Sequence, residues 1–217
     1  MKLVKKLFGV IAIMFCVLGS NSITAQTLKS VFADSESPLL YLGIDFSRNR
    51  LLDVGNASDI RDRIYTSINQ LIINEPKKYD LKGAFNKSNV DNNLNAVIKN
   101  YAKVNLNDIL STNSADFNRL KEADINAVVK ELDIEKKEGV GVLFVMEAMR
   151  KIEKKGDAAI WVTFVDLKSK KVLMTERIEV KASAGFGFRN YWASTIKNLI
   201  DLIGDKKYKE WKQKYSS

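Results

Sequence analysis

The chain has 217 residues and a formal net charge of +9, with 35 Lys and Arg against 26 Asp and Glu. It contains no histidine, which removes the commonest general base and metal ligand, and its one cysteine, Cys16, excludes a disulfide within the chain. Any catalysis would depend on carboxylate, Lys, Tyr or Ser side chains, and we expect no metal and no cofactor.

The first 25 residues have the pattern of a secretory signal peptide. Three lysines form a basic start, residues 7–18 are almost wholly apolar, and a short polar run ends at Ala25. The apolar run is shorter than the about 20 residues that span a bilayer, and no second such run follows. We therefore predict a signal peptide over 1–25 and one soluble domain over 26–217, periplasmic or secreted, without a transmembrane segment.

Export would leave a mature chain without cysteine, because Cys16 would be removed. Cys16 also lacks the small preceding residue that lipid attachment requires. The net charge would fall from +9 to +6, since three lysines and no acidic residue are lost. Such an excess favours solubility, and it favours anionic envelope polymers or lipids over nucleic acid as partners.

Strand and helix patterns alternate in the first half of the chain. Residues 39–46 alternate in hydropathy and predict a strand. Apolar residues recur at helical spacing over 60–72, which predicts a helix with Ser58 as its N-cap and Pro76 as its stop. Residues 77–93 are polar and predict a long connection with room for a short helix.

Two further amphipathic helices are expected in the middle of the chain. Apolar residues at spacings of three and four predict them over 94–102 and from Asp124 to Leu132. Between them, residues 106–120 hold apolar side chains that must be buried, but the pattern is too irregular to assign an element.

The period changes from helical to two after residue 138, and tight turns between the strands predict an antiparallel meander. The strands are expected over 140–146, 159–166 and 172–180, with turns at Gly156-Asp157 and over 168–171. Glu176 falls in the apolar phase of the last strand, which predicts a sheet edge or a charge partner there.

A helix from Trp192 to Ile203, closed by Gly204, follows the meander. The basic tail 205–217 has aromatic residues at helical spacing and is interpreted as a solvated end helix with Trp211 resting on the domain. The alternative is an interfacial helix that faces lipid or a partner. The whole pattern predicts a single α+β domain with a mainly antiparallel sheet and helices packed on it.

The segment Gly185–Trp192 is the candidate binding site. Its glycines permit a sharp turn, its four aromatic residues exceed what a turn needs, and Arg189 can pair with a carboxylate or phosphate. The favoured interpretation is architectural: Phe186 or Phe188 plugs the sheet edge, Trp192 enters the core and Arg189 makes an internal ion pair. The functional alternative is a partner-binding surface made by Phe186, Phe188, Arg189 and Tyr191.

Carboxylates on predicted strands are the candidate catalytic groups. Glycan cleavage needs only a pair of Asp or Glu side chains at the right separation, and such side chains occur at Asp45, Glu147, Asp166 and Glu176. No spacing ties two of them together, so catalysis is the alternative and not the leading hypothesis.

Three segments, Gly43–Ser47, Val142–Glu147 and Gly185–Trp192, resemble those of uncharacterised exported proteins of Gram-negative bacteria. More distantly, the order of helix, meander and helix is similar to the α/β domain of the curli-secretion and penicillin-binding-protein-activator lipoproteins. Those families act as assembly or regulatory partners in the envelope, so the resemblance implies a binding role.

The leading hypothesis is an exported soluble binding or assembly module of the cell envelope. Its expected partner is an envelope protein or glycan and not nucleic acid, and the tail is a further candidate for peripheral membrane contact. The alternative is a carboxylate-dependent envelope or glycan hydrolase.

Overall fold

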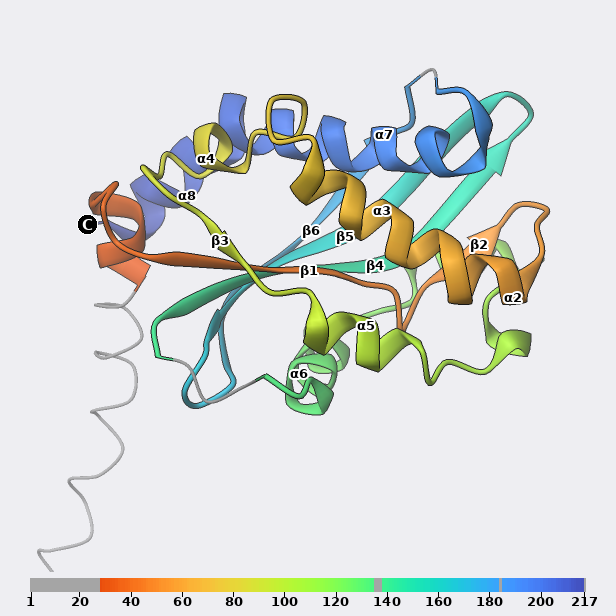
Figure 1. Cartoon of the computed structure of the whole chain (residues 1–217), viewed down its shortest axis with the longest axis horizontal. Coiled ribbons are helices and arrows are strands. Elements are labelled where there is room, and N and C mark those ends of the chain that lie inside the picture. The colour runs from red at the N-terminus through yellow and green to blue at the C-terminus, as the bar shows by residue number, and fades with distance from the viewer. Residues whose placement is uncertain (1–27, 135–137, 184, 217) are drawn as a thin grey trace, which may run out of the picture.

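The computed structural model describes residues 28–134, 138–183 and 185–216, so the predicted signal peptide and Cys16 lie outside the described residues. Within these ranges, six strands form one sheet (Figure 1). Their bounds are β1 Leu39–Asp45, β2 Arg50–Leu52, β3 Asp91–Asn92, β4 Val140–Ile152, β5 Lys155–Asp166 and β6 Lys171–Lys181.

The sheet is mixed, in the order β3-β1-β4-β5-β6, with β2 also beside β4. Strands β4, β5 and β6 pair antiparallel over most of their lengths, which confirms the predicted meander. Strands β1 and β2 both join β4 in parallel, and β3 joins β1 in parallel. The predicted single α+β domain is confirmed, and its longest strand pairings are antiparallel.

Helices cover both faces of the sheet. In Figure 1, α3 and α7 lie side by side above the strands and α6 lies below them. The helices are α2 Ala57–Asp59, α3 Tyr65–Asn74, α4 Leu81–Ala84, α5 Asn95–Tyr101, α6 Glu122–Glu131, α7 Gly187–Leu202 and α8 Tyr208–Tyr215. Two π-helical turns, η1 Ile60–Ile64 and η4 Ile203–Lys207, join α2 to α3 and α7 to α8. The unassigned region 106–120 forms two short 3-10 helices, η2 Leu106–Asp108 and η3 Ser114–Asn118.

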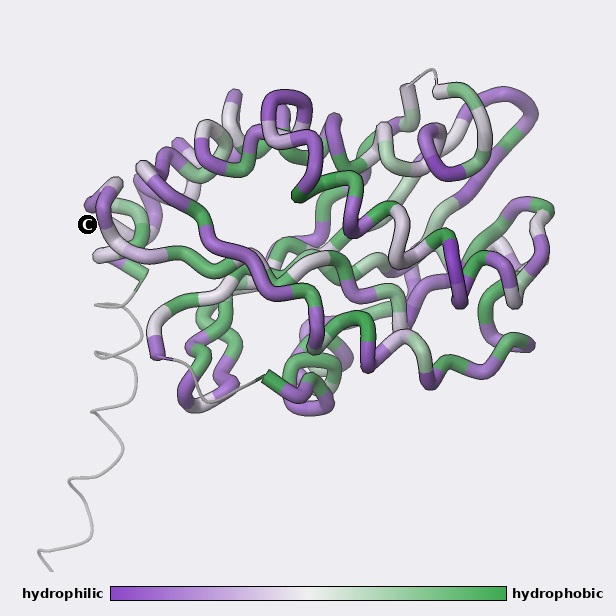
Figure 2. The backbone as a smooth tube through the Cα atoms, in the orientation of Figure 1, coloured by the Kyte–Doolittle hydropathy of each residue, from purple (hydrophilic) through white to green (hydrophobic). Residues whose placement is uncertain are grey.

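Both faces of the central strands are buried, and hydrophobic residues follow these strands in Figure 2. The alternation in β1 therefore does not mark a solvent-exposed face: Tyr41 and Asp45, on the less apolar side, are both buried. Burial of Tyr41 adds hydrophobic area, whereas burial of the Asp45 carboxyl needs hydrogen-bond partners.

The two ends of the described chain meet in the core. Phe32, in the helical residues 28–33, stacks on Tyr215 with ring centroids 6.0 Å apart, and the Tyr208 hydroxyl donates to the Phe32 carbonyl at 3.0 Å. Trp211 is buried beside them. The tail is thus a helix with its aromatic side chains packed on the domain.

The acidic side chain of Glu176 on β6 is held by a hydrogen bond and an ion pair. This strand is at one edge of the sheet. The Glu176 carboxylate accepts a hydrogen bond from the Trp211 indole at 2.5 Å and pairs with the Lys207 ammonium at 2.7 Å. Both sequence expectations, an edge strand and a charge partner, are confirmed.

Gly204 does not close α7, contrary to the sequence prediction. The backbone continues through η4 into α8. A Cβ at Gly204 would lie 3.3 Å from the Cα of Ala84, so the glycine allows α4 to approach this turn closely. Glycine is therefore needed at position 204 so that α4 and η4 can pack closely, and not so that the backbone can change direction.

Two local predictions near Ser58 and Gly156 are also wrong. The first helix is capped by Asn56, whose side-chain oxygen accepts from the Asp59 amide at 3.0 Å, because the helix begins earlier than its apolar stripe. The β4–β5 turn is at residues 153–154, and Gly156 lies within β5. A Cβ at Gly156 would come within 2.5 Å of the Tyr191 hydroxyl, which explains the glycine.

Substitution of Phe32 tests the docking of the two chain ends. Phe32 is 1% exposed and its ring lies 5.3 Å from Phe164. We expect Phe32→Ala to lower the free energy of unfolding by about 3–5 kcal/mol in urea denaturation, because it leaves a cavity. Leu110→Ala, at a residue 38% exposed, is the control and should cost about 1 kcal/mol or less. Equal denaturation midpoints for the two variants would contradict this packing.

Candidate functional site

The predicted binding segment lies at the start of α7, where its side chains point to different surroundings. Phe186 is the N-cap of the helix and is 98% exposed. Phe188 and Tyr191 are half-buried and lie against Trp192, with ring centroids 6.3 and 5.2 Å away. Arg189 is exposed, and its Nε donates to Asn190 at 3.1 Å.

This arrangement corrects part of the architectural interpretation of the segment. Trp192 enters the core as expected. Of the two Phe side chains expected to plug the sheet edge, Phe186 is exposed and does not, whereas Phe188 packs partly buried against the core. Arg189 makes no ion pair within the part of the chain that the structure describes. The segment therefore combines one buried anchor with an exposed aromatic and an exposed cation.

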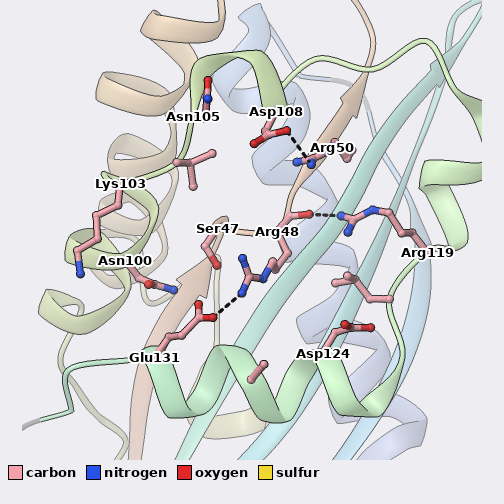
Figure 3. Close-up of a pocket in the computed structure, with 13 residues that line it drawn as sticks. Ser47, Arg48, Arg50, Asn100, Lys103, Asn105, Asp108, Arg119, Asp124 and Glu131 are labelled. Atoms are coloured by element: carbon pink, nitrogen blue, oxygen red, sulfur yellow. Dashed lines mark hydrogen bonds and ion pairs between the residues drawn. The ribbon is translucent and has the colours of Figure 1, made fainter.

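A second site, which the sequence analysis did not single out, lies where β1 ends. It is a pocket of about 720 Å³ between α5, α6 and the turn after β1 (Figure 3). We call it the arginine pocket after three of its lining residues, Arg48, Arg50 and Arg119. Its other lining residues are Ser47, Asn100, Lys103, Val104, Asn105, Asp108, Leu120, Asp124, Ala127 and Glu131.

Asp45 lies beneath the pocket and organises two of its lining side chains. Its carboxylate accepts from the Ser47 amide at 2.8 Å, the Ser47 hydroxyl at 2.5 Å and the Asn100 amide at 2.8 Å. Burial raises the pKa of Asp45 above its usual range, and these hydrogen bonds oppose part of the rise. Asp45 is fully buried, so it acts on the pocket through Ser47 and Asn100.

Two arginines of the pocket are paired with carboxylates near its rim. Arg48 lies 2.6 Å from Glu131 of α6, and Arg50 lies 3.2 Å from Asp108 of η2 (Figure 3). The carboxylates are about half exposed, 46% for Glu131 and 56% for Asp108. Such exposed pairs contribute about 0–1 kcal/mol, so they orient the guanidinium groups without binding them tightly.

Arg119 supplies the third guanidinium group of the pocket, and its side chain is 30% exposed. Its Nη2 donates to the Arg48 carbonyl at 2.6 Å, and its Nε is buried without a hydrogen-bond partner. Its nearest carboxylate contact is with Asp116, at 4.0 Å. Burial and the neighbouring charge of Arg50 lower the pKa of Arg119. An anion in the pocket would relieve the repulsion between the guanidinium groups of Arg119 and Arg50.

The sequence carried one signal for this pocket. Arg48 and Arg50 follow directly after a buried strand, and ligand sites in sheets with parallel strands often lie at the carboxyl ends of those strands. The segment reads as a simple turn until β1 is known to pair in parallel with β4. Arg119 lies about 70 residues further on, and only the fold brings it to Arg48.

Glu147 is fully buried, and all its hydrogen bonds are internal. One oxygen accepts from the backbone amides of Arg119 and Leu120, and the other accepts from the Trp161 indole at 3.0 Å and from the Arg177 guanidinium at 2.7 Å. This carboxylate is therefore a structural acceptor that holds the loop carrying Arg119 against the sheet.

The other strand carboxylates do not gather into a pair. Asp45 on β1 and Glu176 on β6 are separated by β4 and β5. Three strand spacings amount to roughly 14 Å, whereas paired glycosidase carboxyl groups lie about 5–9.5 Å apart. Asp166 accepts from Ser169 in the β5–β6 turn. The hydrolase alternative stays a prediction.

Within the ranges 28–134, 138–183 and 185–216, no group of three or more Asp, Glu, Cys or His side chains could hold a metal ion. In the same part of the chain, none of the helices has the length and apolar character needed to cross a bilayer.

No protein-family profile matches the chain, and no curated protein matches it. Among solved structures, the hypothetical protein CT253 from Chlamydia trachomatis is similar at 9% identity, with a TM-score of 0.38, over 83% of this chain and 98% of that one. The lipoprotein GNA1162 from Neisseria meningitidis is similar at 13% identity, with a TM-score of 0.30, over 76% and 98% of the two chains. Likeness at these scores supports no statement about the function of this chain.

The raised pKa of Asp45 predicts a distinct dependence of stability on pH. The folded state binds the Asp45 proton more tightly than the unfolded chain, whose Asp pKa is about 3.9. Stability contributed by this proton is therefore lost as pH rises from about 4 through the raised pKa. In urea denaturation, we expect the unfolding free energy of wild type to fall relative to that of Asp45→Asn over that pH interval. Above the interval, the difference in unfolding free energy between the two proteins should be constant. A difference that does not vary with pH would contradict the assignment.

Substitution of Glu147 tests its role as a buried acceptor. Glu147→Gln removes the charge beside Arg177 and one acceptor position, and we expect it to cost about 3–5 kcal/mol of unfolding free energy. Glu179→Gln is the matched control, because Glu179 also pairs with Arg177 but is 55% exposed. It should cost about 1 kcal/mol or less. Similar losses for the two variants would contradict the role given to Glu147.

Proposed function

We propose that the protein is an exported binding module of the cell envelope that holds an anionic ligand with carboxylate or phosphate groups in the arginine pocket. The observation that carries this proposal is the convergence of three guanidinium groups on one pocket of about 720 Å³, two from the segment that follows β1 and the third from the loop between η3 and α6. Pockets for small ligands commonly have volumes of about 300–1,000 Å³. Planar guanidinium groups match carboxylate and phosphate oxygens in pairs.

The charges around the pocket would let an anionic ligand bind and dissociate. Glu131 and Asp108 are rim carboxylates in weak pairs, so a ligand can compete for Arg48 and Arg50. Within the described residues, the carboxylate contact of Arg119 is the loose one with Asp116, at 4.0 Å. The exposed Lys103 ammonium makes no ion pair within the described residues and adds a cation at the mouth.

We also propose that the protein is exported and that its partner is a component of the cell envelope. The support for export is the basic and apolar pattern of residues 1–25, and the support for a non-catalytic role is the set of internal contacts around Asp45 and Glu147. An envelope protein or glycan that carries acidic groups would provide the anion.

Binding of two simple anions tests the pocket. We expect inorganic phosphate and citrate to bind saturably to the protein recovered after export, followed by calorimetry and by NMR shifts of residues that line the pocket. Arg119→Ala should weaken citrate binding about ten-fold or more, because it removes a charge-assisted donor. Lys103→Ala should have a smaller effect, since its ammonium is exposed.

Arg63→Ala is the matched control for this experiment. Arg63 is also paired with an aspartate, Asp59, at 2.6 Å, but it lies outside the pocket. It should leave citrate affinity unchanged. Equal effects of Arg63→Ala and Arg119→Ala, or no saturable binding of either anion to wild type, would reject the pocket as an anion site. Glycan turnover that is lost in Asp45→Asn would favour the hydrolase instead.

A further inference from the structure

Three exposed apolar side chains lie at one end of the molecule, in three separate segments. Val54 is 85% exposed, Ile152 is 57% exposed and Phe186 is 98% exposed. They belong to the β2–α2 loop, the β4–β5 hairpin and the start of α7, which share the same end in Figure 1. Isolated exposed apolar residues are ordinary, whereas three of them at the same end of the molecule are a candidate interaction surface.

Specific contacts hold these segments together. The Lys151 ammonium of the hairpin lies 5.4 Å from the ring centroid of Tyr191 in α7. Gly156 lets Tyr191 approach the hairpin, and its carbonyl accepts from the Ala182 amide at 2.7 Å. Strand β2 pairs with β4 at Leu52 and Arg150, which brings the β2–α2 loop beside the hairpin. The apolar tips are therefore presented by a packed scaffold.

The same end carries an excess of cations. Five exposed basic residues surround the tips, and none of them makes an ion pair within the described residues: Lys151, Lys154, Lys155, Lys181 and Arg189. Two acidic residues, Asp53 and Glu153, accompany them. Asp157 is already paired with Arg150, at 3.0 Å. We call the three apolar tips and five cations the docking end.

We propose that the docking end binds the surface of an anionic lipid bilayer. The tips would enter the boundary between headgroups and acyl chains while the surrounding lysines meet lipid phosphates. A lipid surface fits better than a protein groove, because the apolar residues stand on separate segments and form no continuous patch with a packed centre. The docking end shares no residue with the arginine pocket, so the two proposals are independent.

Vesicle flotation tests the proposal directly. The protein recovered after export is mixed with phosphatidylcholine vesicles that contain about 30 mol% phosphatidylglycerol, or none. We expect at least about ten-fold stronger binding to the anionic vesicles, and loss of that binding at about 0.5 M salt. Absence of binding to anionic vesicles, or equal binding to both compositions, would overturn the proposal.

Variants of the docking end measure separately what its lysines and its apolar side chains contribute to vesicle binding. Each lysine near an anionic surface is worth about five-fold in affinity, so Lys151→Glu with Lys155→Glu should weaken binding about 25-fold or more. Phe186→Ser should weaken vesicle binding about ten-fold, because an apolar anchor is lost. Phe186→Trp keeps an aromatic anchor and should bind vesicles as wild type does. Near-ultraviolet circular dichroism confirms that each variant is folded.

A control at the opposite end distinguishes this surface from the basic C-terminal helix. Lys209→Glu with Lys212→Glu makes the same change of charge on α8 (Figure 1). This control should bind as wild type does, and so should Arg119→Ala in the arginine pocket. Loss of binding in the α8 control with retention in the Lys151 and Lys155 variant would move the contact to the tail and overturn the proposal. Cross-linking from position 186 to an envelope protein, without vesicle binding, would overturn it in favour of a protein partner.

Discussion

The carboxylate of Glu147 is the constraint on which the arrangement of the pocket side of the domain depends. It accepts from the backbone amides of Arg119 and Leu120 and pairs with Arg177 at 2.7 Å. Arg177 in turn donates to the Phe117 carbonyl at 2.6 Å. A loop far from β6 in sequence is thereby held on the sheet by a charge that burial makes costly to leave unpaired. The position of Arg119, and with it one wall of the arginine pocket, follows from this interaction.

The arginine pocket and the docking end lie at different points of the domain because the neighbouring strands β1 and β4 differ in length. Strand β1 has 7 residues, whereas its parallel neighbour β4 has 13. Where β1 stops, the chain turns through Arg48 and Arg50, and α5 and α6 enclose the space beside that turn. Strand β4 continues beside β2 and ends in the hairpin that carries Ile152. One difference in strand length therefore produces a recess at one point and a projecting tip beyond it.

Local periodicity was sufficient for most elements, and its failures share a cause. The strand in 39–46, the helices near 60–72 and 94–102 and the meander were all predicted, because each element buries a face with its own repeat. The errors fell on glycines and caps. Gly204 and Gly156 looked like breaks or turns, yet they make room for Ala84 and Tyr191, neighbours that are distant in sequence. Close approach of a remote segment leaves no periodic signal in the chain.

By itself the sequence determined the α+β class, the order of the longer elements and the absence of histidine chemistry. It also singled out Phe186 and Arg189, because an aromatic and a cation beside glycines are conspicuous in any context, but their exposure came from the structure. Only the tertiary structure decided the parallel pairing of β1, the internal role of Glu147 and the convergence of Arg119 on Arg48. These features depend on hydrogen bonds and charges between segments tens of residues apart, which hydropathy patterns do not record.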